Sequence, residues 1–231
     1  MNLRRHLAAA SVAIAAMLAF AGPGSAGTIT ADKIPNGTNF VDLGFATVSS
    51  TPRDFQSKTV DGIEGFGVKG GFVKGEIDLK GESIVIEYPT PTRISEITLG
   101  FMFSAGNFGD VINEVARITA QLVDSIIEAD FSVTGPTTGT WSGDPGATIE
   151  NVAEGTEPNG GAWRILNPFG DLLVSKLTFT AVPVEPAGNN KTNSDFSIVS
   201  VTNDVPAPGA LGLMGLAMVG LGLIRRRMVT G

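Results

Sequence analysis

The sequence predicts an all-β domain, an antiparallel β-sandwich or jelly roll, with an N-terminal signal helix and a single C-terminal hydrophobic helix. Short runs rich in Val, Ile, Thr and Phe recur about every ten residues, with turn-forming residues between them. Apolar residues alternate with small or polar ones at 172–182 and 195–202, as in strands with one buried face. The 30 glycines suit many tight turns. Together these observations favour many short antiparallel strands.

Six segments are predicted as strands from their composition. They are residues 38–48, 72–79, 83–88, 93–103, 172–182 and 195–202. Residues 135–146 and 154–161 are rich in turn formers and are predicted as surface loops. Gly65, Gly67, Gly70 and Gly71 are predicted as turns, because no GK[ST] follows them and a phosphate-binding loop would need it.

One segment, residues 110–131, fits two structures. Its apolar residues fall at helical spacing, at Val111, Val115, Ile118, Leu122 and Ile126. The same residues also fit two strands, 114–122 and 126–133, joined by a turn at 124–125. We favour the strands, because the flanking segments are β-rich and no helix cap is evident.

The N-terminus has the layout of a secretory signal peptide. A basic head ends at His6, an apolar stretch follows over residues 7–20, and small residues come next. Cleavage is expected after Ala21, which completes an A-x-A triplet, or after Ala26. The alternative is a buried N-terminal helix. We take residues 1–26 as the signal peptide, residues 27–203 as the domain and residues 204–231 as a separate C-terminal signal.

The charge of the domain disfavours nucleic-acid binding. The chain has 16 Lys and Arg and 23 Asp and Glu, and five of the arginines but none of the acids lie in residues 1–26 and 206–231. Residues 27–205 therefore hold 16 − 5 = 11 basic and 23 acidic residues, a net charge of −12. Contacts to phosphates need clustered Lys and Arg, so no nucleic-acid partner is expected.

Cysteine is absent and the only histidine is His6, within the signal peptide. The exported domain therefore has no thiol nucleophile, no Ser-His-Asp triad and none of the common zinc ligand sets. These exclusions favour a protein that is not an enzyme.

The C-terminal tail combines three parts in a fixed order. The motif Val205, Pro206, Ala207, Pro208 comes first, an uncharged run over residues 209–224 follows, and the cluster Arg225, Arg226, Arg227 comes last. As a helix the run would be about 24 Å long, short for a hydrocarbon core of about 30 Å. A soluble core helix is disfavoured by its glycines, which membrane helices tolerate. The arginines would hold their end in the cytoplasm, as a stop-transfer cluster does.

This order of parts resembles the PEP-CTERM sorting signal of exported proteins of Gram-negative bacteria. Ala207 stands where that family usually has an acidic residue, so the motif is a variant. The resemblance implies export by the Sec translocon, transient anchoring in the inner membrane and processing by an exosortase. The product would then reside at the cell surface or in the extracellular matrix, in association with exopolysaccharide. Stretches such as GFGVKGGFVKGEIDLKGESIVIEY resemble the β-sandwich domains of such proteins.

Acidic residues near two predicted strands suggest a calcium site. Glu76 and Asp78 share one face of their strand, because side chains two residues apart point the same way. Asp195 lies at the mouth of a late strand. Carboxylate oxygens of this kind suit Ca²⁺, the one cofactor that these residues suggest. The alternative is that all three are solvated edge or turn residues of a very acidic protein.

A carbohydrate-binding module is the alternative function. Trp141 is the candidate for stacking on a sugar ring, whereas Trp163 lies in a run that favours the core. The paired carboxylates of a hydrolase or lyase form a weaker alternative, because among 23 acidic residues some pair always lies at a suitable separation. The favoured interpretation remains a structural or interaction protein of the cell surface or matrix.

Overall fold

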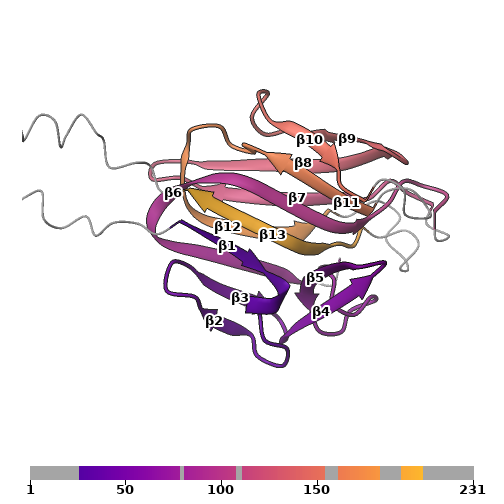
Figure 1. Cartoon of the computed structure of the whole chain (residues 1–231), viewed down its shortest axis with the longest axis horizontal. Helices are drawn as coiled ribbons and strands as arrows, with labels where there is room; N and C mark the ends of the chain where they lie inside the picture. Colours follow the sequence, from indigo (N-terminus) through magenta and orange to yellow (C-terminus); the bar gives the residue numbers. More distant parts are fainter. Residues whose placement is uncertain (1–25, 79–80, 108–110, 154–160, 183–193, 205–231) are drawn as a thin grey trace, which may run out of the picture. The chain divides into compact units, whose positions relative to one another are not determined.

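The computed structural model describes residues 26–78, 81–107, 111–153, 161–182 and 194–204 (Figure 1). They belong to one compact unit, Ala26–Pro206. The predicted signal peptide, sorting motif, hydrophobic run and arginine cluster lie outside the described residues. None of the helices in the described part of the chain is long and apolar enough to cross a membrane.

The fold is all-β, and its thirteen strands form one large antiparallel sheet. In chain order the elements are β1 (Gly27–Thr30), the 3-10 helix η1 (Ala31–Lys33), β2 (Phe40–Asp42), β3 (Thr47–Thr51), β4 (Phe55–Val60), β5 (Ile63–Val68), β6 (Ser83–Met102), β7 (Val115–Gln121), β8 (Ile126–Gly135), β9 (Thr138–Trp141), β10 (Thr148–Asn151), β11 (Gly161–Leu166), β12 (Leu173–Ala181) and β13 (Ser197–Asp204).

Strand β6 organises the sheet, because its two ends pair with different neighbours. Residues 83–87 pair with β3 on one side and residues 84–87 with β12 on the other. Farther along, residues 93–100 pair with β13 and residues 96–102 with β11. The ladder is interrupted between these parts, where Pro89 and Pro91 lie. Proline has no N–H to donate, so it is tolerated only where no ladder bond is required.

The interruption divides the sheet into two half-sheets. The first half-sheet runs β2-β3-β6-β12-β7-β8-β9, and the second runs β4-β5-β13-β6-β11-β10 with β1 beside β13. Their apolar faces pack together in a sandwich-like way, since Phe131 of β8 contacts Trp163 of β11 with ring centroids 5.5 Å apart. Both rings are buried in one continuous apolar core.

Strand alternation decides which side chains enter this core. In β7 every second residue is buried, and β12 follows the same alternation except at Ser175 and Lys176, which are both partly exposed. The inward residues include Ile118, Ala120, Leu177 and Phe179, all fully buried. The outward residues are mostly polar, and the apolar ones among them, Val115, Leu173 and Ala181, lie at the strand ends. The outer face of the first half-sheet is therefore largely polar.

Several sequence predictions are confirmed. Residues 172–182 contain β12 and residues 195–202 lie largely in β13. The ambiguous segment forms β7 and β8 and not a helix. The apolar residues at helical spacing there belong to a hairpin in which Gln121 lies opposite Ile126.

Other predictions are wrong in their boundaries. Residues 38–48 contain β2, a turn and the start of β3, because Asp42 Oδ1 accepts a hydrogen bond from the N–H of Gly44 and turns the chain. Residues 83–88 and 93–103 belong to a single strand, β6. The expected loop at 135–146 contains β9. Only isolated bridges form in the described part of the expected strand 72–79, at Glu76 and Ile77.

Gly65 and Gly67 lie within β5, so their prediction as turns is wrong. A Cβ atom at Gly67 would lie 2.4 Å from the carbonyl oxygen of Gly75. Glycine is therefore required by the close approach of two backbone segments. Gly70 and Gly71 have φ of 108° and 71° and do occupy a turn.

Candidate functional site

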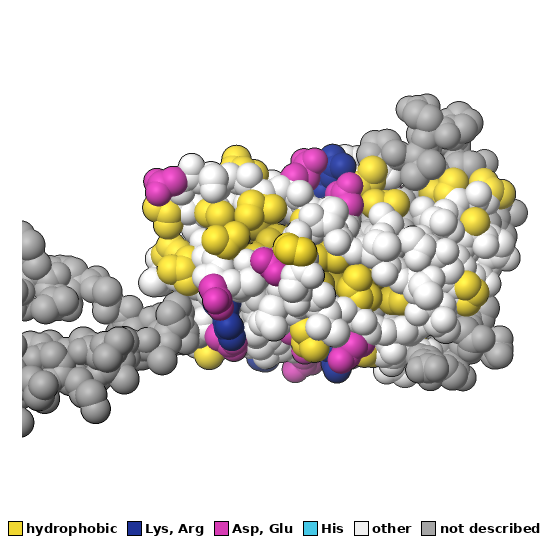
Figure 2. All heavy atoms as spheres, turned by 90° about the horizontal axis from the view of Figure 1, so that it is seen from above, with side chains coloured by type: hydrophobic (Ala, Val, Ile, Leu, Met, Phe, Trp, Pro, Cys, Tyr) yellow, Lys and Arg dark blue, Asp and Glu magenta, His cyan; other side chains and the backbone are white. Residues whose placement is uncertain are grey.

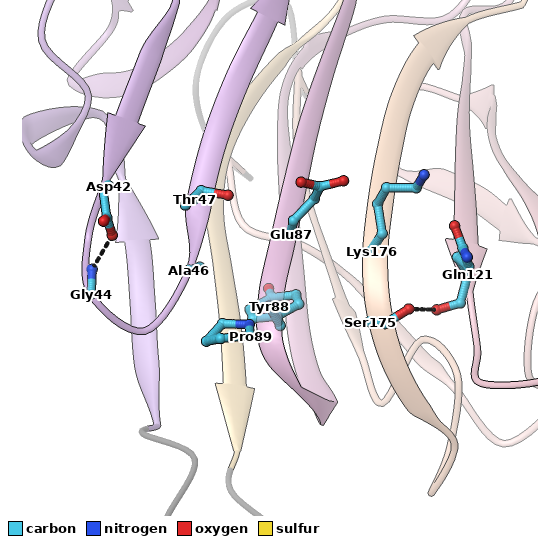
Figure 3. A pocket seen from close by; sticks show the side chains of 10 residues that line it. All are labelled: Asp42, Gly44, Ala46, Thr47, Glu87, Tyr88, Pro89, Gln121, Ser175 and Lys176. Atoms are coloured by element: carbon cyan, nitrogen blue, oxygen red, sulfur yellow. Dashed lines mark hydrogen bonds between the residues drawn. The ribbon is translucent and has the colours of Figure 1, made fainter. Parts of the chain in front are cut away.

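A pocket of about 540 Å³ lies on the outer face of the first half-sheet (Figure 3). Its walls come from β3, β6, β7, β12 and the turn between β2 and β3. The lining residues are Asp42, Gly44, Ala46, Thr47, Glu87, Tyr88, Pro89, Gln121, Ser175 and Lys176.

The pocket lies where β6 and β12 lose their register. Val174 pairs with Thr92 and Lys176 pairs with Glu87, so residues 88–91 of β6 lie opposite Ser175 alone. Extra residues on one strand bend it and redirect its side chains. The irregularity that divides the sheet therefore also opens the pocket.

Four polar side chains form a row across the pocket, which we call the polar row: Thr47, Glu87, Lys176 and Gln121. Thr47 pairs with Glu87, Glu87 with Lys176, and Lys176 with Gln121, each directly across neighbouring strands. Figure 3 shows them side by side on four strands. Neighbouring strands lie about 4.8 Å apart, so the polar row spans about 14 Å.

The side chains of the polar row make no hydrogen bond or ion pair with any other residue that the structure describes. Glu87 is exposed and the other three are partly exposed. Lys176 and Glu87 are opposite in charge and directly across from each other, yet they do not form a salt bridge. The polar row thus presents a carboxylate, an ammonium, an amide and a hydroxyl to solvent, with their hydrogen-bonding capacity unused.

The other polar side chains of the pocket hold its frame. Asp42 Oδ1 accepts the N–H of Gly44 at 2.8 Å and fixes the turn between β2 and β3. The Ser175 hydroxyl donates to the backbone oxygen of Gln121 at 3.0 Å and ties β12 to β7 at the irregularity. Pro89 adds exposed apolar surface to the pocket.

Tyr88 lies beneath the pocket and is only 6% exposed. Its hydroxyl is buried and has no hydrogen-bond partner among the described residues. Burial raises the pKa of Tyr88 well above its ordinary value, so the phenol stays neutral. A buried unpaired hydroxyl costs free energy of folding.

An exposed aromatic ring lies beside the pocket on the same face. Phe40 is 56% exposed and shares the outward side of β2 with Asp42, while Val41 between them packs toward the core. Among the strands that the structure describes, β2 pairs only with β3, so this ring lies at the edge of the half-sheet.

The structure places the predicted calcium ligands near one another but engages them within the protein. Glu76 and Asp78 are 1% exposed and Asp195 is 8% exposed. The bridge between Ile77 and Phe196 sets the segments of Asp78 and Asp195 beside each other. Glu76 forms a salt bridge with Lys58, and Asp78 accepts the N–H of Phe72.

No group of three or more His, Cys, Asp or Glu in the described ranges is arranged to hold a metal ion. Glu76, Asp78 and Asp195 thus do not form a shared metal centre there, and calcium binding stays a prediction without a site. The expectation that they are solvated edge residues is wrong, because all three are buried.

Asp78 and Glu82 form a buried carboxylate pair that sequence analysis did not single out. The N–H of Asp78 donates to Glu82 Oε2 at 3.1 Å, and Glu82 is 3% exposed. Burial, together with the charge of Asp78, raises the pKa of Glu82 from 4.5 to about 7. A Cβ at Gly71 would lie 2.1 Å from Asp78 Oδ2, so the turn closes tightly over this pair.

Trp141 and Trp163 both pack inside the protein. Trp163 is 1% exposed and donates its indole N–H to the oxygen of Met102, which confirms its assignment to the core. Trp141 is partly buried, donates its indole N–H to the oxygen of Pro168 and packs edge-on against Phe169. A stacking role of Trp141 on sugars stays a prediction, and Phe40 offers a more exposed ring.

The charged side chains do not gather into a basic surface on the face seen in Figure 2. Lys and Arg side chains there lie beside Asp and Glu side chains. Arg117 illustrates the pattern, because it binds Asp130 and Glu128 with N–O distances of 2.8 and 2.9 Å.

The chain matches no family model, no curated protein and no solved structure. The geometry of the described residues therefore carries the functional argument.

Proposed function

We propose that the chain is an exported structural or interaction protein of the cell surface or extracellular matrix. In this proposal the Sec translocon exports it, its tail anchors it transiently in the inner membrane, and an exosortase-type enzyme cleaves near Val205–Pro208. Residues 27–203 then form the working domain, a β-sandwich of jelly-roll type associated with exopolysaccharide.

The observation that carries the proposal is the pairing of the first and last strands. β1 lies antiparallel to β13, and Gly27 is directly opposite Asn203. One predicted cleavage region directly precedes β1 in the sequence and the other directly follows β13. Both therefore adjoin the end of the sheet where Gly27 lies opposite Asn203. Removal of both terminal segments would leave every described strand pair intact.

Contacts at Asp204 give further support. The side chain of Arg93 binds Asp204 Oδ2 at 2.9 Å, and the Thr92 hydroxyl donates to its backbone oxygen at 2.6 Å. The last described residue is thus tied to β6 directly before the proline motif. A cut within that motif would not release β13 from the sheet.

The proposal is tested by expressing the full chain in an exosortase-containing bacterium and in a mutant that lacks the enzyme. The expected product in the first strain is an extracellular protein beginning after Ala21 or Ala26 and ending near Pro208, by mass spectrometry of the intact protein. In the second strain we expect the uncut tail to retain the protein in the inner membrane.

A matched pair of variants isolates the motif. Pro206→Ala with Pro208→Ala is expected to accumulate uncut in the membrane fraction. Pro35→Ala with Pro145→Ala alters two exposed prolines of the domain and is expected to be processed normally. Equal processing of both double variants, or a tail present on the extracellular protein, would refute the sorting mechanism.

A carbohydrate-binding role is the second candidate function, and the polar row in the pocket favours it. The unpaired hydrogen-bonding groups of this row lie on an open sheet face and not in a buried reaction centre. This arrangement suits binding without chemistry.

A further inference from the structure

We propose that the outer face of the first half-sheet binds a neutral, hydroxyl-rich polysaccharide chain that lies across the strands along the polar row. The inference rests on the proposed function, in which the protein reaches a polysaccharide-containing matrix. It adds the binding face, the direction of the bound chain and the charge class of the ligand.

The chemistry of the polar row matches sugar hydroxyls. Each hydroxyl of a sugar both donates and accepts a hydrogen bond. Glu87 only accepts, Lys176 only donates, and Thr47 and Gln121 do both. The row therefore offers partners for hydroxyls in any orientation, and hydrogen bonds to its two charged groups are the stronger ones.

The free protein is already arranged for such a ligand. The strands of Glu87 and Lys176 are paired on both sides, so the positions of their Cα atoms are fixed. No bond to another described residue has to be broken before a ligand binds. The row is also longer, at about 14 Å, than a single sugar ring, so it suits a chain of several sugars.

Apolar surface lies where a sugar chain needs it. Pro89 lines the pocket and is exposed, whereas Ala46 lines it but is only 1% exposed. On β2, Asp42 lies directly opposite Thr47, and Phe40 lies two residues along the strand from Asp42, opposite Ser49, with its ring more than half exposed on the same face. Binding sites commonly combine apolar and aromatic contacts with a few placed polar groups. The ring of Phe40 is therefore assigned to stacking on one sugar of the chain.

Charge selects a neutral ligand over an acidic one. Residues 27–205 carry a net charge of −12, and the pocket itself holds Asp42 and Glu87 against Lys176 alone. A polyuronate would be repelled by this field, and the repulsion would grow at low ionic strength. A neutral glycan meets no such cost.

The test is affinity electrophoresis of the protein, produced with its own export signals, through native gels. The gels contain hydroxyethyl cellulose, dextran, alginate or the exopolysaccharide of the producing bacterium. We expect retardation by at least one of the two neutral polymers and none by alginate. The double variant Glu87→Gln, Lys176→Met should bind at least about tenfold more weakly, because it removes two charge-assisted hydrogen bonds.

The matched control is the double variant Glu64→Gln, Lys69→Met. It makes the same chemical changes at exposed positions of β5 and the following turn, outside the pocket. Its retardation should equal that of the unchanged protein. Phe40→Ala should weaken binding as well. Because the Phe40 ring is exposed, the thermal midpoint of this variant should equal that of the unchanged protein.

Three outcomes overturn the inference: no retardation by either neutral polymer, equal retardation of the pocket variant and its control, or stronger retardation by alginate. Cell fractionation separates this result from the proposed function. If the protein is processed and extracellular, but the pocket variant is retarded as strongly as the unchanged protein, only the proposed binding face is refuted. A protein that stays uncut in the membrane while the purified domain binds neutral glycan refutes only the sorting proposal.

Discussion

Trp163 and Phe131 join the two half-sheets, with ring centroids 5.5 Å apart and planes inclined at 46°. Trp163 comes from β11 and Phe131 from β8, which do not pair with each other. Trp163 also donates to the oxygen of Met102 at 3.0 Å. Trp163 thus packs against the first half-sheet and donates a hydrogen bond within the second half-sheet, to which it belongs.

Trp163→Ala should lower the free energy of unfolding by about 3–5 kcal/mol, because it leaves a cavity between the half-sheets. Trp163→Phe keeps a ring but leaves the Met102 oxygen without its donor, so a smaller loss is expected. Urea unfolding followed by circular dichroism measures both. Equal losses for the two variants would show that the ring contact does not stabilise the fold.

Glu82 should make stability depend on pH near neutrality. Its pKa is 4.5 ordinarily and about 7 in the folded protein. Between these values the folded state holds a proton that the unfolded state has released. The stabilisation is therefore complete below about pH 4.5 and is lost as pH rises through about 7.

Glu82→Gln should flatten this dependence, because the amide is neutral at every pH and still reaches Asp78. The measurement is the thermal midpoint of both proteins from pH 5 to pH 8. Glu64→Gln, at an exposed position, serves as the control and should keep the slope of the unchanged protein. An identical slope in Glu82→Gln would assign the pH dependence to other groups.

Tyr88→Phe should stabilise the protein by about 1 kcal/mol, because it removes a buried hydroxyl that has no partner among the described residues. This corresponds to a rise of about 2–4 °C in the melting temperature of a domain of this size. Differential scanning calorimetry checks it. A lower melting temperature would mean that the hydroxyl is satisfied in solution.

Alternation along a single strand was predictable from the sequence, and so was the all-β class. In β12, Leu177 and Phe179 point inward while Lys176 and Thr178 point outward, as their polarity requires. The pairing of Lys176 with Glu87 was not predictable. These residues are far apart in the chain, and register between distant strands depends on packing of the whole sheet.

Interrupted pairing misled sequence analysis in a specific way. Sequence analysis predicted two strands, 83–88 and 93–103, but β6 continues through Pro89 and Pro91 because neither neighbour pairs with residues 88–91 and so needs their N–H groups. Gly67 suggested a turn, but it serves a close backbone approach inside a strand. The sequence shows Glu76 and Asp78 as acidic residues but not the partners that they have in the fold, Lys58 and the N–H of Phe72.

The salt bridge between Lys58 and Glu76 provides the sharpest stability test. The Glu76 side chain is 2% exposed, its Oε2 has no partner among the described residues, and Lys58 Nζ also lies 4.7 Å from the centroid of Phe101. Lys58→Met should cost about 3 kcal/mol, because it leaves a buried carboxylate without its counter-charge. Adding Glu76→Gln should recover part of that loss, since the neutral amide costs less to bury.

A double-mutant cycle from urea unfolding measures this coupling. Glu128→Gln is the control, because its salt bridge with Arg117 lies at the surface, where Glu128 is 54% exposed. Exposed pairs contribute little, so this change should cost less than about 1 kcal/mol. If Lys58→Met cost no more than Glu128→Gln, the salt bridge with Lys58 would not be what stabilises the buried carboxylate of Glu76.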